Sequence, residues 1–368
     1  MFAQNMNTTR TIKPHHIELS KKFVDRCLAE SQAWIKSSTY YHSDFLFDIL
    51  LKAAVKKTSI ENICFGSPQL PSPDTVMAML AQTHLLKSRD ELETQVSQLY
   101  QAQVSRHVMF KHHRMPKVIL AIDLHDEEYY GKHLFDGEKR VTMFSQSKHR
   151  NALRFGTLCI VSAQGQWSYP LTIGFVVNYL GQSRTEVVKR LLSQITLPIK
   201  IECLLIDGGF NDAELFEWLD HSNIRFVCRG RYGRKNAGKL NTCFQYRVGS
   251  KRYPTFGYLY ARNTGNGKRE VVFLLSNHKF SLGKIKNLYR KRFRIENTYR
   301  HAKLTKMRTS TSKIQLRWIM WALAHFLELV WELLRYIFKD LNYKSYFMRQ
   351  MKFIDWVHGW LELALHPA

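Results

Sequence analysis

The chain has 368 residues, 45% hydrophobic and 13% aromatic, so it is long enough for two or three domains with buried cores, and general disorder is not expected. Its 55 Lys and Arg residues against 30 Asp and Glu give a net charge of +25, which favours a polyanionic partner, nucleic acid before an anionic membrane. The six cysteines are scattered without a C-x-x-C pair, which argues against a disulfide framework or a zinc ribbon and fits a cytoplasmic protein.

Residues 1–116 are predicted to be mainly helical. Apolar residues at helical spacing cover 16–35 and 43–57, with Ser43 as the expected N-cap of the second helix. A Pro-rich loop follows, and Pro73 marks the start of a third helix. Helix, turn and helix in this order are compatible with a helix-turn-helix reader of DNA and equally with an ordinary helical domain. We predict a DNA-binding region here.

Residues 117–310 show a different pattern, in which short apolar runs alternate with amphipathic segments. The runs VILAID and IECLLID are typical of buried strands, and each ends in an aspartate. The alternation predicts an α/β domain with a mixed sheet, including an antiparallel hairpin that turns at 164–166. Strands and helices are expected at 118–123, 157–163, 167–177, 183–195, 201–207, 211–223 and 224–231.

An insert at about 232–280 interrupts this alternation. Three runs with strand character, joined by Gly- and Asn-rich turns, predict three β-strands. A long helix then carries the segment NLYRKRFRIENTYRHAKLTKMR, residues 287–308.

Residues 311–368 are predicted to be a C-terminal helical region rich in Trp. The apolar stretch 319–338 is interrupted by His325, Glu328, Glu332 and Arg335, three or four residues apart, which would form one polar stripe along a helix. A membrane span would not carry such a stripe, so the segment is expected to be a packed amphipathic helix and no membrane partner is expected.

Two carboxylates stand out because they follow buried strands directly. In open α/β sheets, ligands gather at the carboxyl ends of strands, so Asp123 and Asp207 are candidates for one site. Each could instead cap the turn that follows it. Asp126, Glu127 and Glu128 compete for the role of the first carboxylate, and Asp123 is preferred because it ends the apolar run.

A third carboxylate, Glu296, lies in strongly basic surroundings. From Arg229 to Arg308 the chain has 22 Lys and Arg residues but only two acids. An ion pair on the helix surface with Arg292 or Arg300, each one turn from Glu296, would explain this one acid but not the spacing of the residues around it. The wider spacing of Tyr289, Arg292, Glu296 and Lys303 places all four along one helix face, where cations can grip phosphates and the carboxylate can hold a divalent ion.

This pattern, Y-x2-R-x3-E-x6-K, resembles the signature of a large group of bacterial insertion-sequence transposases. The resemblance extends from Val118 to Lys303. It implies an α/β fold with a ribonuclease-H-like mixed sheet and a β-strand insertion, flanked by N- and C-terminal helical regions. It also implies a DDE triad that binds two Mg²⁺ or Mn²⁺ ions, namely Asp123, Asp207 and Glu296. Contacts to transposon-end DNA are implied for Tyr289, Arg292 and Lys303.

The resemblance implies metal-dependent cleavage of double-stranded DNA at transposon ends, followed by strand transfer into target DNA, and a homodimer assembled on DNA. The sequence departs from the family in two turns. Gly208 stands where the family commonly has Arg, and Leu124-His125-Asp126 stands where it commonly has Gly-Thr-Thr. The alternatives are therefore an inactive DNA-binding relic and a nuclease of the same fold without strand transfer. The D-x-x-D of IDLHD lacks the D-x-D spacing of an aspartyl phosphohydrolase, which disfavours that class.

Overall fold

A computed structural model describes residues 26–27, 34–65, 68–85, 87–106, 116–136, 139–141, 144–147, 150–161, 168–176, 183–232, 238–249, 252–263 and 267–340. Most of the helix expected at 16–35, the turn at 164–166 and the segment from 341 onward lie outside the described residues. Among the described parts, none of the helices combines the length and apolar character needed to cross a bilayer.

Nine described strands form one mixed sheet in the order β4-β5-β1-β7-β8-β11-β10-β9, and β6 pairs with β5. Strands β7 and β8 run parallel to β1, whereas β5 and β6 alternate in direction as an antiparallel hairpin. This confirms the predicted mixed sheet. The strands are β1 Lys117–Tyr129, β4 Phe144–Ser147, β5 Arg150–Val161, β6 Ser168–Val176, β7 Lys200–Ile206, β8 Phe226–Arg229, β9 Thr242–Val248, β10 Tyr253–Asn263 and β11 Arg269–Ser276.

The central strands form because their apolar runs are buried on both faces. Residues 118–122 of β1 and 203–206 of β7 are all buried, as expected for parallel strands covered by helices on each side. The expectation that the first strand ends at Asp123 is wrong. Strand β1 continues to Tyr129 because its antiparallel pairing with β5 extends beyond the point where β7 stops.

The three strands of the predicted insert are confirmed, and they extend the main sheet. Strand β11 pairs with β8 through Leu274 opposite Arg229 and Leu275 opposite Cys228, and β10 and β9 follow it outward. Three short strands were not predicted: β4 and the hairpin of β2 (Leu134–Asp136) and β3 (Lys139–Val141), which forms a separate sheet.

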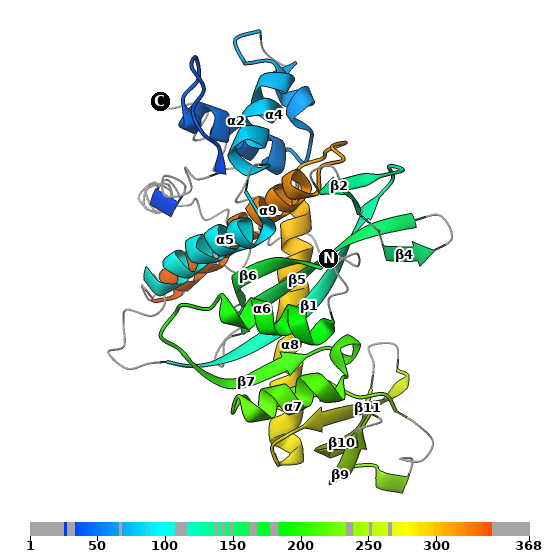
Figure 1. Cartoon of the computed structure of the whole chain (residues 1–368). Coiled ribbons are helices and arrows are strands. Elements are labelled where there is room, and N and C mark those ends of the chain that lie inside the picture. Colours follow the sequence, from blue (N-terminus) through cyan, green and yellow to red (C-terminus); the bar gives the residue numbers. More distant parts are fainter. Residues whose placement is uncertain are drawn as a thin grey trace, which may run out of the picture.

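Helices cover both faces of the sheet, with α6 and α7 on one side and the long α8 passing behind it (Figure 1). Helix α6 begins with a capping box, in which the Ser183 side chain accepts from Glu186 N–H and the Glu186 side chain accepts from Ser183 N–H. The predicted cap at Ser43 is wrong, because α2 has His42 as N-cap without a side-chain cap hydrogen bond. The helices are α2 Ser43–Val55, α3 Ile60–Cys64, α4 Pro73–His84, α5 Arg89–Val104, α6 Arg184–Ser193, α7 Ala213–His221, α8 Leu282–Thr305 and α9 Ile314–Asp340.

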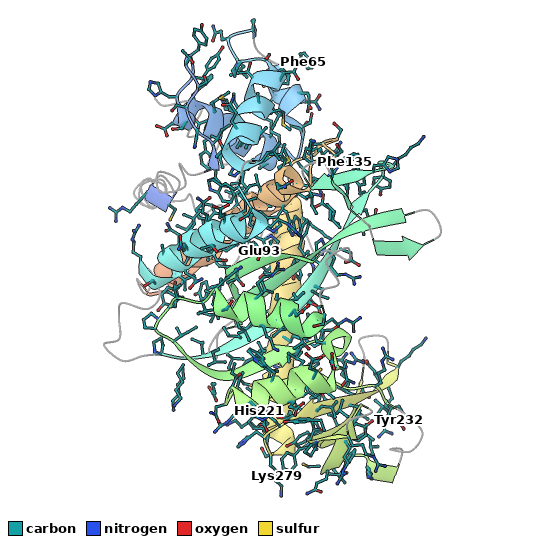
Figure 2. The ribbon with its side chains drawn as sticks, viewed as in Figure 1. Phe65, Glu93, Phe135, His221, Tyr232 and Lys279 are labelled. Atoms are coloured by element: carbon teal, nitrogen blue, oxygen red, sulfur yellow. The ribbon has the colours of Figure 1, made fainter. Side chains whose placement is uncertain are left out.

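The N-terminal helices are joined to the sheet through α5, which lies beside α9 and packs on β6 (Figure 1). Glu93 of α5 is fully buried between α5 and α6 (Figure 2). Its carboxylate lies 3.4 Å from Nη1 of Arg190 and accepts a hydrogen bond of 2.9 Å from Gln194. The helical character predicted for 1–116 is confirmed in its described part, while the boundary at 116 and the DNA-binding role remain predictions.

Candidate functional site

One buried guanidinium, that of Arg292 on α8, lies between three carboxylates from three elements. Its Nη2 donates to Oε1 of Glu296 at 2.6 Å and lies 3.7 Å from Oδ1 of Asp207. Its Nη1 donates to Oδ2 of Asp123 at 3.2 Å. Both distances are measured from Nη2, so the Glu296 and Asp207 oxygens lie at most about 6 Å apart. Residues separated by up to 173 positions thus meet at one place.

The sheet register sets the two aspartates side by side. Ile122 of β1 pairs with Ile206, the last residue of the parallel β7. Asp123 is the next residue of β1, and Asp207 directly follows β7. Because side chains alternate in step along parallel neighbours, both carboxylates point to the same face. That face is covered by α8, which brings Glu296 to them. Asp123, Asp207 and Glu296 therefore lie near one another, as the sequence predicted.

Asp123 is the most enclosed of the three. Its side chain is 16% exposed, and Leu124 N–H donates to its Oδ1 at 2.9 Å. Burial raises the pKa of Asp123 to about 6, an effect opposed by Arg292 and reinforced by the negative charge of Asp207 and Glu296. Tyr299 fixes the backbone here by donating its hydroxyl to the Asp123 carbonyl at 2.9 Å.

Asp207 and Glu296 face solvent more openly, with side chains 40% and 42% exposed. Asp207 caps the short 3-10 helix η4 (Gly208–Phe210), since its Oδ2 accepts from Gly209 N–H at 3.3 Å. A Cβ at Gly208 would lie 3.2 Å from the carbonyl oxygen of Arg229, so this turn is tight against β8. Asp207 therefore caps this turn, as the alternative interpretation predicted, and also lies near Arg292; its role in a site remains a prediction.

The other acids of β1 are engaged elsewhere. Asp126 forms a two-pronged pair with Arg154 of β5, at 2.5 and 2.7 Å. Glu127 is buried and pairs with Lys306 and with Arg317. Of the acids considered for the first position, Asp123 is the one that the structure places with Asp207 and Glu296.

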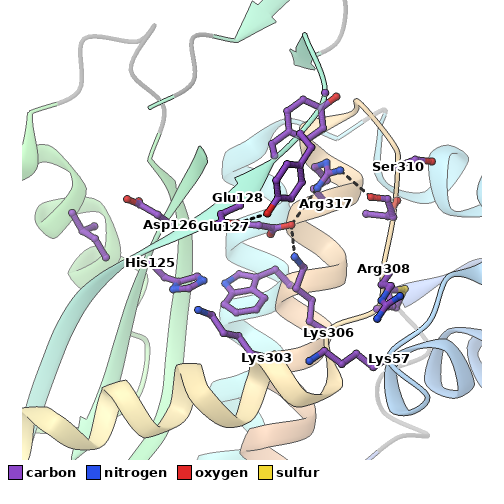
Figure 3. A pocket seen from close by; sticks show the side chains of 17 residues that line it. Lys57, His125, Asp126, Glu127, Glu128, Lys303, Lys306, Arg308, Ser310 and Arg317 are labelled. Carbon is purple, nitrogen blue, oxygen red and sulfur yellow. Dashed lines mark hydrogen bonds and ion pairs between the residues drawn. The ribbon is translucent and has the colours of Figure 1, made fainter. Parts of the chain in front are cut away.

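The residues expected to contact DNA divide into two environments. Tyr289 and Arg292 are only 2% and 6% exposed because this face of α8 packs on the sheet. The Tyr289 hydroxyl has no hydrogen-bond partner among the described residues. Lys303 is exposed and belongs to a different hollow from Glu296, a pocket of about 1000 Å³ beside the end of β1 (Figure 3). The Lys and Arg residues that line that pocket are Lys57, Lys303, Lys306, Arg308 and Arg317.

A basic groove of about 690 Å³ follows the outer side of α8 and reaches Glu296. Burial and the neighbouring Arg290 lower the pKa of Arg294, which shows that positive charge is crowded here. Such crowding favours an anionic ligand. Sequence reasoning did not single out this set, although Arg290 and Arg294 are one turn apart. The groove is lined by Asn287, Arg290, Lys291, Phe293, Arg294, Glu296, Asn297 and Arg300.

The three carboxylates suit hard divalent cations, because all of their donors are oxygens and two of them are open to solvent. Three carboxylates against one guanidinium leave a net negative charge when all are ionised. In the described structure they are spread around Arg292 and do not form a group whose ligand atoms all lie within 4.8 Å of one another. For all three carboxylates to hold a divalent cation, either the guanidinium of Arg292 moves aside or the cation lies on the carboxylate oxygens that face away from it.

Comparison with known proteins places these residues in context. A family model described as "Transposase DDE domain" matches residues 159–327, a stretch that contains Asp207, Arg292 and Glu296 and begins after Asp123. The fold is similar to that in a cryo-EM structure of the piggyBac transposase synaptic complex with hairpin DNA, with a TM-score of 0.54 and 12% identity over 94% of this chain and 79% of that one. The α/β fold is thus the ribonuclease-H-like type found in transposases. Among curated proteins no sequence relative is found.

Proposed function

We propose that this protein is a DDE transposase that binds transposon ends, cuts them in a metal-dependent reaction and joins them to target DNA. The observation that carries this proposal is the meeting of Asp123, Asp207 and Glu296 around Arg292, beside a groove lined with arginines. The matching family model, which covers two of the three acids, supports the same activity.

The three acids would hold two Mg²⁺ or Mn²⁺ ions, which supply activation of water and stabilisation of the leaving oxygen in phosphodiester cleavage. Arg292 keeps the carboxylates together by offsetting their mutual repulsion. Arg292 offsets only one of the three carboxylate charges. The remaining negative charge would repel the DNA phosphates, so a proton or a bound cation must neutralise it before DNA binds.

The bound DNA would be positioned by residues of α8. Exposed Arg290 and Arg300 in the groove would neutralise backbone phosphates next to Glu296. Lys303 would contact a further phosphate at the neighbouring pocket. Tyr289 and Arg292 are buried, so they would contact a DNA strand only next to the three carboxylates. There the Tyr289 hydroxyl, which has no partner among the described residues, can donate to a phosphate oxygen of the DNA.

Joining two transposon ends needs two active sites in one complex, so we propose a homodimer assembled on double-stranded DNA in the cytoplasm. Sedimentation of the full chain with and without end DNA tests this. A complex that contains two protomers per DNA assembly supports the dimer. A single protomer both with and without DNA contradicts it.

A strand-transfer assay tests the proposed reaction. The full chain is incubated with Mg²⁺, a fragment carrying the element's ends and a supercoiled plasmid. Joined products from the wild type support a transposase. Cut ends without joining would indicate a nuclease of the same fold, and binding without cutting would indicate an inactive relic. Glu214→Gln, at an exposed acid in the first turn of α7, is the matched control for Glu296→Gln.

A further inference from the structure

Three of the four residues in the polar stripe of α9 are buried. His325, Glu328 and Glu332 are 0%, 1% and 3% exposed, in a helix whose other residues from Trp318 to Leu334 are also buried. Burying a carboxylate is costly unless a cation or a proton neutralises it and hydrogen bonds satisfy its oxygens. Two such carboxylates, one helical turn apart, therefore require a partner.

The facing helix supplies a histidine at this position. Nδ1 of His301 on α8 lies 3.0 Å from Oε1 of Glu328. His301, Glu328 and Glu332 each offer one ligand atom, and these three atoms all lie within 4.8 Å of one another. Neighbouring ligand atoms of a tetrahedral zinc ion are about 3.4 Å apart. A closure of up to about 1.4 Å would bring these three atoms to tetrahedral spacing around one ion, with a water or a second carboxylate oxygen in the fourth position.

The described residues provide a cationic partner and hydrogen bonds for only some of the carboxylate oxygens in this cluster. Glu332 pairs with Arg335 at 2.8 Å through Oε1. The Oε2 atoms of Glu328 and Glu332 are buried and have no hydrogen-bond partner among the described residues. A shared proton would reduce the charge but would leave at least one of these oxygens without a partner.

The protonation preferences of the groups agree with this geometry. Burial, reinforced by the charge of Glu328, raises the pKa of Glu332 to about 8, and burial raises the pKa of Glu328 well above its ordinary value. Burial lowers the pKa of His301, which favours the neutral imidazole that a metal requires. A bound dication would reverse the preference of the two carboxyls by supplying positive charge.

We propose that His301, Glu328 and Glu332 form a structural site for a transition-metal dication of the zinc type, which clamps α8 to α9. One imidazole with two carboxylates suits Zn²⁺ better than Mg²⁺, which prefers oxygen ligands and keeps its waters. The site is separate from the Asp123, Asp207 and Glu296 cluster and exists whether or not the chain cuts DNA. Because His301 follows Glu296 on the same helix, the ion would also fix the position of α8 at the carboxylates.

Metal counting on the full chain tests this site. To remove the other carboxylate cluster, Asp207→Asn and Glu296→Gln are introduced together, and the protein is stripped with a chelator and dialysed against Zn²⁺. Elemental analysis is expected to show about one equivalent more zinc than in the same protein with His301→Ala or Glu328→Gln added. Adding His221→Ala, at an exposed histidine of α7, serves as the matched control and should leave the zinc content unchanged.

Cobalt spectroscopy of the parent protein provides a second readout that does not depend on the stability of the His301→Ala or Glu328→Gln proteins. Co²⁺ bound to the parent protein should show visible d–d absorption of a low-coordinate site, lost on adding excess Zn²⁺ and unaffected by excess Mg²⁺. Equal zinc content in the parent and the His301→Ala protein overturns the proposal. Absence of retained zinc and of a cobalt spectrum in the parent also overturns it, and leaves a shared proton between the two carboxyls.

Discussion

Nη2 of Arg292 lies 2.6 Å from Oε1 of Glu296, one turn further along the same helix. On a helix surface such a pair would contribute only a few tenths of a kcal/mol. Here the Arg292 side chain is 7% exposed, and its guanidinium also reaches Asp123 and Asp207. The pair is therefore part of a charge cluster between the helix and the sheet, in which one cation offsets three anions.

Replacement of Arg292 by Gln should destabilise the protein in the absence of divalent ions. The enclosed Asp123 would lose its counter-charge, whereas the more exposed Asp207 and Glu296 would remain partly solvated, so the free energy of unfolding should fall by about 2 kcal/mol. Millimolar Mg²⁺ should restore part of this loss, and should stabilise the variant more than the wild type. Denaturant unfolding with chelator and with Mg²⁺ measures both effects.

Arg290→Gln is the control for that substitution, because Arg290 lies on the exposed side of α8. It should change the unfolding free energy by less than about 0.5 kcal/mol in either condition. A loss of stability for Arg292→Gln that Mg²⁺ leaves untouched would show that its role is packing alone.

Separate replacement of Asp123 and of Asp126, both on β1, tests which of them is the first carboxylate of the site. Asp123→Asn should lower the cleavage rate by at least about 10³-fold, because it removes a proposed ion ligand. Asp126→Asn should cost about 1 kcal/mol of stability through the lost pair with Arg154 while leaving cleavage nearly unchanged. The opposite result, an active Asp123→Asn and an inactive Asp126→Asn, would assign the role to Asp126.

The arginines of the α8 groove should govern the salt dependence of DNA binding. Arg290→Gln and Arg300→Gln should each weaken binding and reduce the slope of log affinity against log salt by about one. Fluorescence anisotropy with labelled end DNA over a range of salt concentrations measures this slope. Arg247→Gln, on β9 and outside the groove lining, is the control. An unchanged slope in both groove variants would place the DNA elsewhere.

Sequence analysis predicted the core of the fold because the apolar runs of β1, β7 and β8 are short, continuous and separated by clear helices. Asp123 and Asp207 were selected as candidates for the same reason, since each ends or follows an apolar run. The true end of β1 was not predictable from its own residues. Its polar half from Leu124 to Tyr129 is held as a strand by pairing with β5, which is a tertiary effect.

Helical periodicity identified the faces of α8 and α9 but not what covers them. The pattern from Tyr289 to Lys303 was expected to present one face to DNA, whereas the sheet buries Tyr289 and Arg292 and leaves Lys303 exposed. The stripe of α9 was predicted as the polar side of an amphipathic helix. Its residues His325, Glu328 and Glu332 are buried, and α8 packs on α9 so that His301 lies against Glu328. The sequence of a single helix does not specify such neighbours.

The N-terminal helices contain a histidine that should make stability depend on pH. Burial lowers the pKa of His84 to about 4, and its Nε2 lies 2.6 Å from the Trp34 carbonyl. The unfolded chain binds the proton with a pKa near 6.5, so the unfolded state takes up more protons between those values. The contribution of neutral His84 is complete above about pH 6.5 and is lost as the pH falls toward 4.

Lowering the pH from 7 to 5 should therefore cost the wild type about 2 kcal/mol through His84. His84→Gln keeps a side-chain donor but cannot titrate, so its unfolding free energy should fall less over the same range. Parallel dependence of both proteins on pH would contradict this assignment.

Cleavage of end-labelled transposon-end DNA by purified wild type and Glu296→Gln, in the presence of Mg²⁺ and resolved on a denaturing gel, tests the proposed chemistry most directly. We expect the wild type and the Glu214→Gln control to release a product with a 3′-hydroxyl, and Glu296→Gln to bind the DNA normally but cut it at least about 10³-fold more slowly. Cutting by Glu296→Gln at the wild-type rate would contradict the account.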